Sequence, residues 1–401
     1  MATPEPTREE KQILYLTVVT ALRGVIDNLR RVVWQPFALS LGVPIRSIGA
    51  LESLMDLAKI AVQPVLGAAS DVYGRKPFLI LRDLLILSSC LCFLFARSWL
   101  LLAASMTLLG LSVALIPVWQ TAVAESATGS EMGRIYSVLG SSYMATGLLG
   151  TLAAGWLADN VGYRVVFSLA AFFAAASLLV TTLRIGETRG RTASASFTLS
   201  QVWGSLLDTF RPPRYLWGFY VAMSVDLFAF SVGWRLINGL LTEAFSFTPG
   251  MLGLMTAVNA GTMALFQVVL GRYVDRVGYV KYLAISQALS CILLASLLIN
   301  QSFPVAMTAN VLMGFSAAFW APAEQAWIAQ NVDPVERAKS IGGYATFRGL
   351  VALPGPLIGG ILYDEYGYHM PMLVNLVLAA IDVGLIVFLV RDRVRPEETI
   401  D

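Results

Sequence analysis

Long apolar runs alternate along this chain with short polar segments. A helix needs roughly 20 predominantly apolar residues to cross the hydrocarbon core of a bilayer. We predict twelve such spans, at residues 12–40, 46–70, 78–96, 99–125, 134–158, 164–184, 214–241, 249–271, 279–299, 303–330, 338–362 and 369–390. The pattern therefore predicts an all-α membrane protein.

One spacing recurs after four of the apolar runs: glycine, three residues, aspartate, two residues, glycine. The copies are Gly67-Asp71-Gly74, Gly155-Asp159-Gly162, Gly271-Asp275-Gly278 and Gly360-Asp364-Gly367. They lie 88 and 89 residues apart within each half of the chain, and 204 and 205 residues apart between halves. Internal repeats in this register are typical of secondary transporters. We therefore expect two pseudo-symmetric six-helix halves, residues 1–184 and 214–401, each with a repeated three-helix unit.

The composition agrees with a place in the bilayer. The chain is 57% apolar and 13% charged with a mean hydropathy of +0.69, whereas a soluble domain carries about 25% charged residues. The polar start of the chain lacks a short apolar core with a cleavage site, so we expect the first helix to be retained. Cys90, Cys92 and Cys291 fall in apolar runs, which favours buried thiols over a disulfide framework.

The distribution of Lys and Arg predicts the orientation. With the N-terminus in the cytoplasm, the outer segments hold only Arg46, Arg97 and Arg164 of the 28 basic residues. Cytoplasmic segments carry the excess of positive charge, so we predict both termini in the cytoplasm and a location in the cytoplasmic membrane of a bacterium or archaeon. The net charge of +2 gives no indication of nucleic-acid binding. The expected partners are a small-molecule substrate and the lipid bilayer, and the expected functional unit is a monomer.

The middle of the chain, residues 185–213, is polar and is predicted to be a cytoplasmic linker. Its apolar residues at helical spacing are Val202, Trp203, Leu206, Leu207 and Phe210. A short amphipathic helix on the membrane surface and a flexible tether both fit this pattern.

The first copy of the repeated spacing carries a family resemblance. Gly67-Ala-Ala-Ser-Asp71-Val-Tyr-Gly74-Arg75-Lys76-Pro77 resembles the signature loop of the major facilitator superfamily. The resemblance spans about residues 12–391 and implies that two halves rock about a midplane site. It also implies a latch that favours the outward-open state, in which Asp71 faces the N-terminal dipole of the eleventh helix near Ala338. The alternative is that the loop only sets the topology, with Arg75 and Lys76 holding it on the cytoplasmic side.

Two further motifs qualify the resemblance. The second-half copy of the loop, with Gly271, Asp275 and Gly278, is degenerate but recognisable. Proton-driven drug exporters of the family usually carry Gly-Pro-x-x-Gly-Gly in the fifth helix. This chain has Gly150-Thr151-Leu-Ala-Ala154-Gly155 there and the full motif in the eleventh helix, as Gly355-Pro356-Leu-Ile-Gly359-Gly360.

Charged side chains inside the spans are candidate functional groups, because each is costly to insert into a membrane. The first helix carries Arg23, Asp27, Arg30 and Arg31 with Trp34 one turn beyond, and the second carries Glu52, Asp56 and Lys59. If the two helices pack antiparallel, Arg23 meets Lys59, Asp27 meets Asp56 and Arg30 meets Glu52 at three depths. This set is either a neutral network that packs the hairpin or a proton-coupling and substrate site.

The second half adds further candidates. Asp226 and Arg235 lie in the seventh helix, and Arg31 maps onto Arg235 at a spacing of 204. Paired arginines of this kind resemble the organophosphate:phosphate branch of the family, and they bind an anion or act as structural anchors. The fourth and tenth helices, which line the pathway in this family, contribute Trp119, Gln120, Glu125, Trp320, Glu324 and Gln325.

These observations predict a secondary active transporter that moves a small solute by alternating access, with protons as the expected coupling ion and no cofactor or metal. Two substrate classes stay open: amphipathic compounds exported by a multidrug transporter, and organic anions moved by an exchanger or symporter. A non-transporting membrane sensor on the same fold is a remoter alternative. No nucleophile–base pair, metal cluster or nucleotide-binding loop is visible, so an enzyme is not expected.

Overall fold

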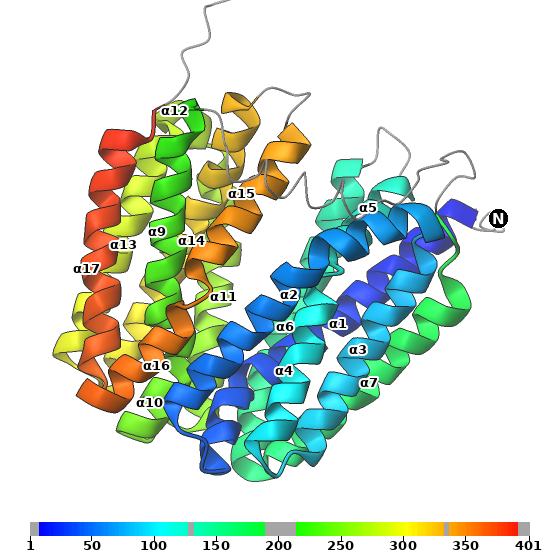
Figure 1. The fold of residues 1–401 in the computed structure, drawn as a ribbon, viewed down its shortest axis with the longest axis horizontal. Coiled ribbons are helices and arrows are strands. Elements are labelled where there is room, and N and C mark those ends of the chain that lie inside the picture. Colours follow the sequence, from blue (N-terminus) through cyan, green and yellow to red (C-terminus); the bar gives the residue numbers. More distant parts are fainter. Residues whose placement is uncertain (1–7, 127–131, 189–213, 333–336, 392–401) are drawn as a thin grey trace, which may run out of the picture. The chain divides into compact units, whose positions relative to one another are not determined.

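The computed structural model describes residues 8–126, 132–188, 214–332 and 337–391. Within these ranges nearly all residues are helical and no strand occurs (Figure 1). In the first half of the sequence the helices are α1 (Arg8–Ser40), α2 (Ile45–Tyr73), α3 (Lys76–Phe95), α4 (Trp99–Val113), α5 (Ile116–Glu125), α6 (Met132–Asn160) and α7 (Tyr163–Arg184). The predicted all-α class is confirmed.

The second half of the sequence begins with the short 3-10 helix η1 (Arg214–Leu216). It continues with α9 (Trp217–Val232), η2 (Trp234–Leu236), α10 (Ile237–Phe245), α11 (Pro249–Gly271), α12 (Val274–Val277), α13 (Tyr279–Ile299), α14 (Phe303–Asn331), α15 (Arg337–Ala352), α16 (Gly355–Tyr366) and α17 (His369–Leu389). Nine helical segments of the described chain are long and apolar enough to cross a membrane. The count of twelve spans stays a prediction, as does the helix expected in the linker, whose residues 189–213 lie outside the described ranges.

Proline and glycine account for several breaks within the predicted spans. Pro117 and Pro356 each stand in the first turn after an interruption, between α4 and α5 and between α15 and α16. Proline has no N–H to continue the helical ladder, and its ring clashes with the carbonyl four residues earlier. Gly233 separates α9 from η2.

The four repeated turns share a backbone conformation. The last glycine of each copy has a positive φ: +94° at Gly74, +113° at Gly162, +100° at Gly278 and +77° at Gly367. Residues other than glycine rarely adopt a positive φ. The backbone conformation of the turn therefore explains why each copy of the repeat ends in glycine. The first glycine of each copy lies near or at the end of one helix, and the last glycine lies in the turn just before the next helix.

The chain forms two compact units. The described residues of Met1–Val202 together with Asn238–Ala257 make up the first, and those of Trp203–Ile237 together with Val258–Asp401 make up the second. In the first unit α1 packs along α6 and α7, while α3 packs along α4 and α7. In the second, α9 packs along α15, α16 and α17, while α13 packs along α14 and α17. The two units thus repeat one packing scheme. The division of the sequence into two halves at residues 1–184 and 214–401 stays a prediction.

Each unit has its own apolar core. In the first, Phe93 of α3 stacks on Phe167 of α7 with ring centroids 5.1 Å apart. In the second, Phe219 of α9 stacks on Trp327 of α14 at 4.0 Å. These buried rings hold the helices that carry the charged side chains described next.

Candidate transport and coupling site

One guanidinium bridges two carboxylates in the second unit. Arg348 of α15 donates from Nη2 to Oδ2 of Asp226 on α9 at 3.0 Å, and from Nη1 to Oε1 of Glu324 on α14 at 2.5 Å. The hydroxyl of Tyr344 also donates to Glu324, and Trp320 Nε1 donates to its other oxygen at 3.0 Å. Three helices are therefore joined through Arg348.

A third carboxylate belongs to the same cluster. The amide nitrogen of Gln287, on α13, donates to Oδ1 of Asp226 at 3.0 Å and to Oδ2 of Asp382, on α17, at 2.7 Å. Asp382 is completely buried, and its Oδ1 has no hydrogen-bond partner in the described part of the chain. We call Asp226, Glu324, Asp382, Arg348 and Gln287 the acidic cluster. It holds three carboxyl groups and one guanidinium.

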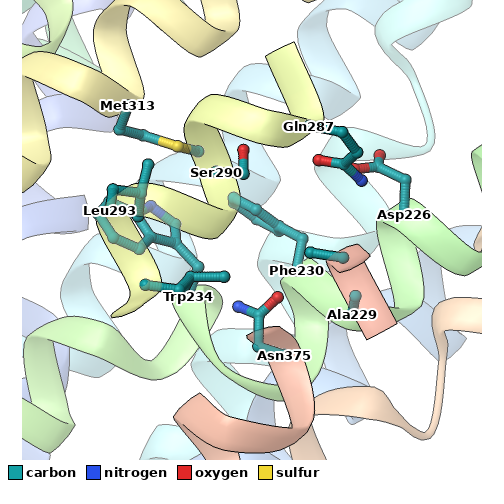
Figure 2. A pocket seen from close by; sticks show the side chains of 11 residues that line it. Asp226, Ala229, Phe230, Trp234, Gln287, Ser290, Leu293, Met313 and Asn375 are labelled. Atoms are coloured by element: carbon teal, nitrogen blue, oxygen red, sulfur yellow. The ribbon is translucent and has the colours of Figure 1, made fainter. Parts of the chain in front are cut away.

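A pocket within the second unit reaches this cluster (Figure 2). Asp226 and Gln287 lie together on one side of it, while Trp234, Leu293 and Met313 line the opposite side. The remaining lining residues are Ala229, Phe230, Ser290, Leu294, Asn375 and Ala379. The pocket is therefore mostly apolar and aromatic, with its charge at one end, which is the usual composition of a small-molecule site.

The first unit also buries charged side chains, two arginines among them, between its helices. Arg23 of α1 forms a buried ion pair with Asp83 of α3, and Thr181 of α7 donates to the same carboxylate. Arg82 is also buried and stacks over the ring of Trp119 at 5.5 Å, a cation–π contact. Neither Nε nor Nη1 of Arg82 has a hydrogen-bond partner among the residues that the structure describes. Asp27 accepts a hydrogen bond from Tyr143 of α6 at 3.2 Å.

The predicted meeting of Arg23 with Lys59 is wrong, whereas the levels predicted for Asp27 with Asp56 and for Arg30 with Glu52 stay predictions. Arg23 pairs with Asp83 instead of meeting Lys59, and Lys59 bonds Asp56 of its own helix at 3.3 Å. The physical reason is the packing: α1 lies along α6 and α7 and contacts α2 only weakly. Near the end of α1, Gln35 donates to Glu52 at 3.4 Å.

The other predicted site residues are dispersed. Trp34 is buried in the core beside Phe93. Arg31, Gln120 and Gln325 are exposed, whereas Arg30 and Arg235 are half-buried. Roles for these residues in substrate binding stay predictions.

The signature loop is organised by charge. Arg75 pairs with Asp71 at 2.5 Å and with Glu125 at 3.1 Å. Partial burial opposes the charge of Arg75, but the two carboxylates outweigh it and raise the pKa of its guanidinium above the usual value. Glu187 accepts hydrogen bonds from the backbone N–H groups of Arg75 and Lys76 at 2.8 and 3.1 Å, at the start of α3. The predicted contact of Asp71 with the helix start near Ala338 would join the two units and stays a prediction.

The second copy of the repeat contacts the start of a helix, as was predicted for the first copy, but this contact lies within the first compact unit. Asp159, at the end of α6, accepts from the backbone N–H of Gly250 and from the hydroxyl of Thr248, both at 2.9 Å. These residues surround the start of α11, where a carboxylate satisfies a free N–H and faces the positive end of the helix dipole.

Sequence reasoning missed several residues of the acidic cluster and several of the charged and polar residues buried in the first unit. They are Arg82, Asp83 and Tyr143 in the first unit and Gln287, Arg348 and Asp382 in the second. Arg348 and Asp382 lie inside predicted spans, so the rule that charges in membrane helices are functional candidates was sufficient to find them. Arg82 and Asp83 also lie inside a predicted span, 78–96, and both are buried in α3.

The family model of the Major Facilitator Superfamily matches residues 16–234 and 219–401. The chain therefore belongs to the major facilitator superfamily, and it is a multi-pass membrane protein and secondary transporter. It is 26% identical over 345 residues to the multidrug resistance protein MdtG of Klebsiella pneumoniae (strain 342), covering 82% of this chain and 79% of that protein. It is also 26% identical over 331 residues to the maltose permease of Geobacillus stearothermophilus, covering 80% and 79%.

Solved structures show the same fold. The crystal structure of the nucleoside transporter NupG superposes with a TM-score of 0.79 at 14% identity, covering 94% of this chain and 98% of that chain. Multidrug, sugar and nucleoside transporters thus share the architecture, and the fold by itself does not assign a substrate.

Proposed function

We propose that the protein exchanges protons for small amphipathic cations and exports them. The observation that carries this proposal is the composition of the acidic cluster, which holds three carboxyl groups and a single guanidinium, that of Arg348, bonded to Asp226 and Glu324 but not to Asp382. Buried charges without compensation are costly. The excess negative charge is therefore balanced by a bound proton or by a bound cation.

This balance supplies a mechanism of exchange. A cation that binds beside Asp226 neutralises the negative charge that a bound proton would otherwise neutralise. Proton and substrate therefore compete for the same carboxyl groups. The aromatic and apolar lining of the pocket next to Asp226 suits the hydrophobic part of an amphipathic substrate. The similarity to multidrug resistance proteins supports the outward direction, because resistance is obtained by removing a drug from the cell.

The test is proton release on binding. Tetraphenylphosphonium is added to the purified protein in weakly buffered detergent, with protein-free micelles as the blank. About one proton released per bound cation is expected, and Asp226→Asn and Glu324→Gln should each weaken cation binding roughly tenfold or more through loss of a charged contact. Binding without proton release, or binding that survives both substitutions, would reject the proposal.

A second candidate, transport of an organic anion, is favoured by the unsatisfied donors of Arg82 in the first unit. A guanidinium with free N–H groups is suited to bidentate contact with a carboxylate or phosphate. Tetraphenylborate, which matches tetraphenylphosphonium in shape and carries the opposite charge, separates the two candidates. If the anion binds and Arg82→Gln abolishes its binding, this second candidate replaces the first.

The remaining assignments belong to the same proposal. We expect a monomer in the bacterial cytoplasmic membrane with both termini in the cytoplasm, driven by the proton gradient and working without a metal, an organic cofactor or an enzymatic reaction. The bacterial sources of its relatives support the membrane, and the scarcity of basic residues in the predicted outer segments supports the orientation.

A further inference from the structure

We infer that Asp382 holds a coupling proton and that this proton is reached through the pocket inside the second unit, which also borders Asp226. Asp382 lies on α17 and was not among the residues expected from the sequence. The inference rests on the proposed proton coupling and assigns the site and access route of the proton.

The surroundings of Asp382 favour a neutral carboxyl group. The side chain is fully buried, Oδ2 accepts from Gln287 at 2.7 Å, and Oδ1 has no partner among the described residues. A buried carboxylate needs a cation or several donors to remain charged. The neighbouring guanidinium, Arg348, is already bonded to Asp226 and Glu324, so one amide N–H is the only donor that faces Asp382 within the described structure.

The groups around Asp382 also explain how its proton is coupled to substrate. Asp226 faces it from α9, Arg348 acts on it from α15, and the thiol of Cys291 lies near it on α13. The nitrogen of Gln287 bonds both Asp382 and Asp226, which holds two acidic groups close together. Two such groups do not both ionise readily in an apolar interior. A change in the charge balance at Asp226, such as the arrival of a cation, therefore changes proton binding at Asp382.

The pocket supplies a path for this proton. Asp226 and Gln287 close one end of it (Figure 2). Ala379, which also lines the pocket, precedes Asp382 by about one turn of α17. The space open to water is about 30 Å³, which is sufficient for a water molecule with polar partners. Ser290 and Asn375 offer such partners along the wall. The pocket extends from the acidic cluster to Trp234, which follows the C-terminal end of α9.

The experiment is infrared difference spectroscopy of the full-length protein in lipid, comparing acid with alkaline pH. The carbonyl stretch of a protonated buried carboxyl group should disappear as the pH is raised, and Asp382→Asn should remove one such band. Asp364→Asn, which changes an exposed carboxylate at the end of α16, is the matched control and should leave the band in place. An unchanged band in Asp382→Asn would overturn the inference.

A second variant tests the route and does not depend on the folding of Asp382→Asn. Ser290→Leu narrows the pocket without touching a carboxyl group. After a rapid pH jump, its band should change several-fold more slowly than in the unsubstituted protein, with the same final amplitude. An unchanged rate would place the access route elsewhere and overturn that part of the inference.

Two further comparisons separate this inference from the proposed exchange of protons for cations. If tetraphenylphosphonium releases no proton but the Asp382 band is present, the proposed exchange fails while Asp382 remains a proton site. If NaCl abolishes the band at constant pH and choline chloride does not, the site takes sodium and the inference is overturned.

Discussion

At the scale of single residues, the buried charges of this protein differ in how completely they are compensated. Arg23 and Asp83 neutralise each other inside the first unit, with Thr181 completing the carboxylate's contacts. Asp382 in the second unit has an unpartnered oxygen within the described structure. Compensated pairs maintain the fold, whereas an uncompensated group is available for protons or substrate.

The Arg23–Asp83 pair is expected to be essential for stability. Asp83→Asn leaves the buried Arg23 without its carboxylate, and breaking a buried pair in this way costs about 3–5 kcal/mol. The double variant Arg23→Gln with Asp83→Asn should be less destabilised than Asp83→Asn alone. Thermal unfolding of the purified variants in detergent measures the difference.

Asp56→Asn is the control for this comparison. Its partner Lys59 lies on the same helix with 29% of its side chain exposed, against 6% for Arg23, so breaking this pair should cost less stability. Equal losses of stability for Asp83→Asn and Asp56→Asn would contradict the distinction between the two pairs.

The residue types of the site were predictable, but their partners were not. The sequence shows that Arg23, Asp27 and Asp226 lie within spans, because charges interrupt apolar runs. The partner of Arg23 is 60 residues away in α3, and no spacing rule identifies it. The glycine of each repeated turn was predictable because one conformation, a positive φ, requires it.

At the scale of helices, glycine determines where the axes approach most closely. A Cβ at Gly359 of α16 would lie 1.9 Å from the carbonyl oxygen of Val232 on α9, and one at Gly355 would lie 2.7 Å from Cβ of Ser231. The Gly-Pro-x-x-Gly-Gly motif of the eleventh predicted span therefore permits α16 to pack directly on α9. This contact explains Gly355 and Gly359 without reference to substrate or ion specificity.

Gly359→Ala is therefore expected to destabilise the second unit by about 1–3 kcal/mol, because the added methyl group overpacks a backbone contact. Gly384→Ala on α17 is the matched control, since a Cβ there meets nothing within 4 Å, and the higher helix propensity of alanine should stabilise it by a few tenths to about 1 kcal/mol. Melting temperatures compare the two. A neutral Gly359→Ala would show that the helices separate easily at this point.

Helix positions were more predictable than helix neighbours. The predicted span 279–299 coincides with α13, and 164–184 differs from α7 by one residue, because apolar length is read directly from sequence. The predicted α1–α2 ladder assumed that consecutive helices pack side by side. In the first unit α1 instead packs on α6 and α7, and this interleaving depends on the whole bundle.

At the scale of the whole molecule, the repeat duplicates the packing but not the chemistry. Ser177 and Asp382 stand 205 residues apart, and Asp83 and Gln287 stand 204 apart. In the first unit the hydroxyl of Ser177 donates to Asp83 at 3.4 Å, and in the second the amide of Gln287 donates to Asp382. Donor and acceptor stand on exchanged helices: the carboxylate lies on α3 beside Arg23 in the first unit and on α17 within the acidic cluster in the second.

The same duplication predicts two opposing latches. The two repeat copies that contain Asp71 and Asp159 each end at a glycine of positive φ. An odd number of predicted spans separates the two aspartates, so we expect them on opposite sides of the membrane. Asp159 caps α11 through Gly250 and Thr248, and Asp71 is expected to cap the helix that begins near Ala338. Each cap should stabilise closure at its own side of the membrane.

Asp71→Asn is therefore expected to increase the inward-open population and Asp159→Asn the outward-open population. Loss of a charged cap costs about 0.5–2 kcal/mol, which is roughly a two- to thirtyfold change in the ratio of the two states. Single reporter cysteines at the two mouths, in a background lacking Cys90, Cys92 and Cys291, measure the shift by their labelling rates. Asp364→Asn, in the fourth copy, is the control for a change of charge alone. Shifts of the same sign in both variants would show that the repeated aspartates act only on folding, since two latches on opposite sides must bias alternating access in opposite directions.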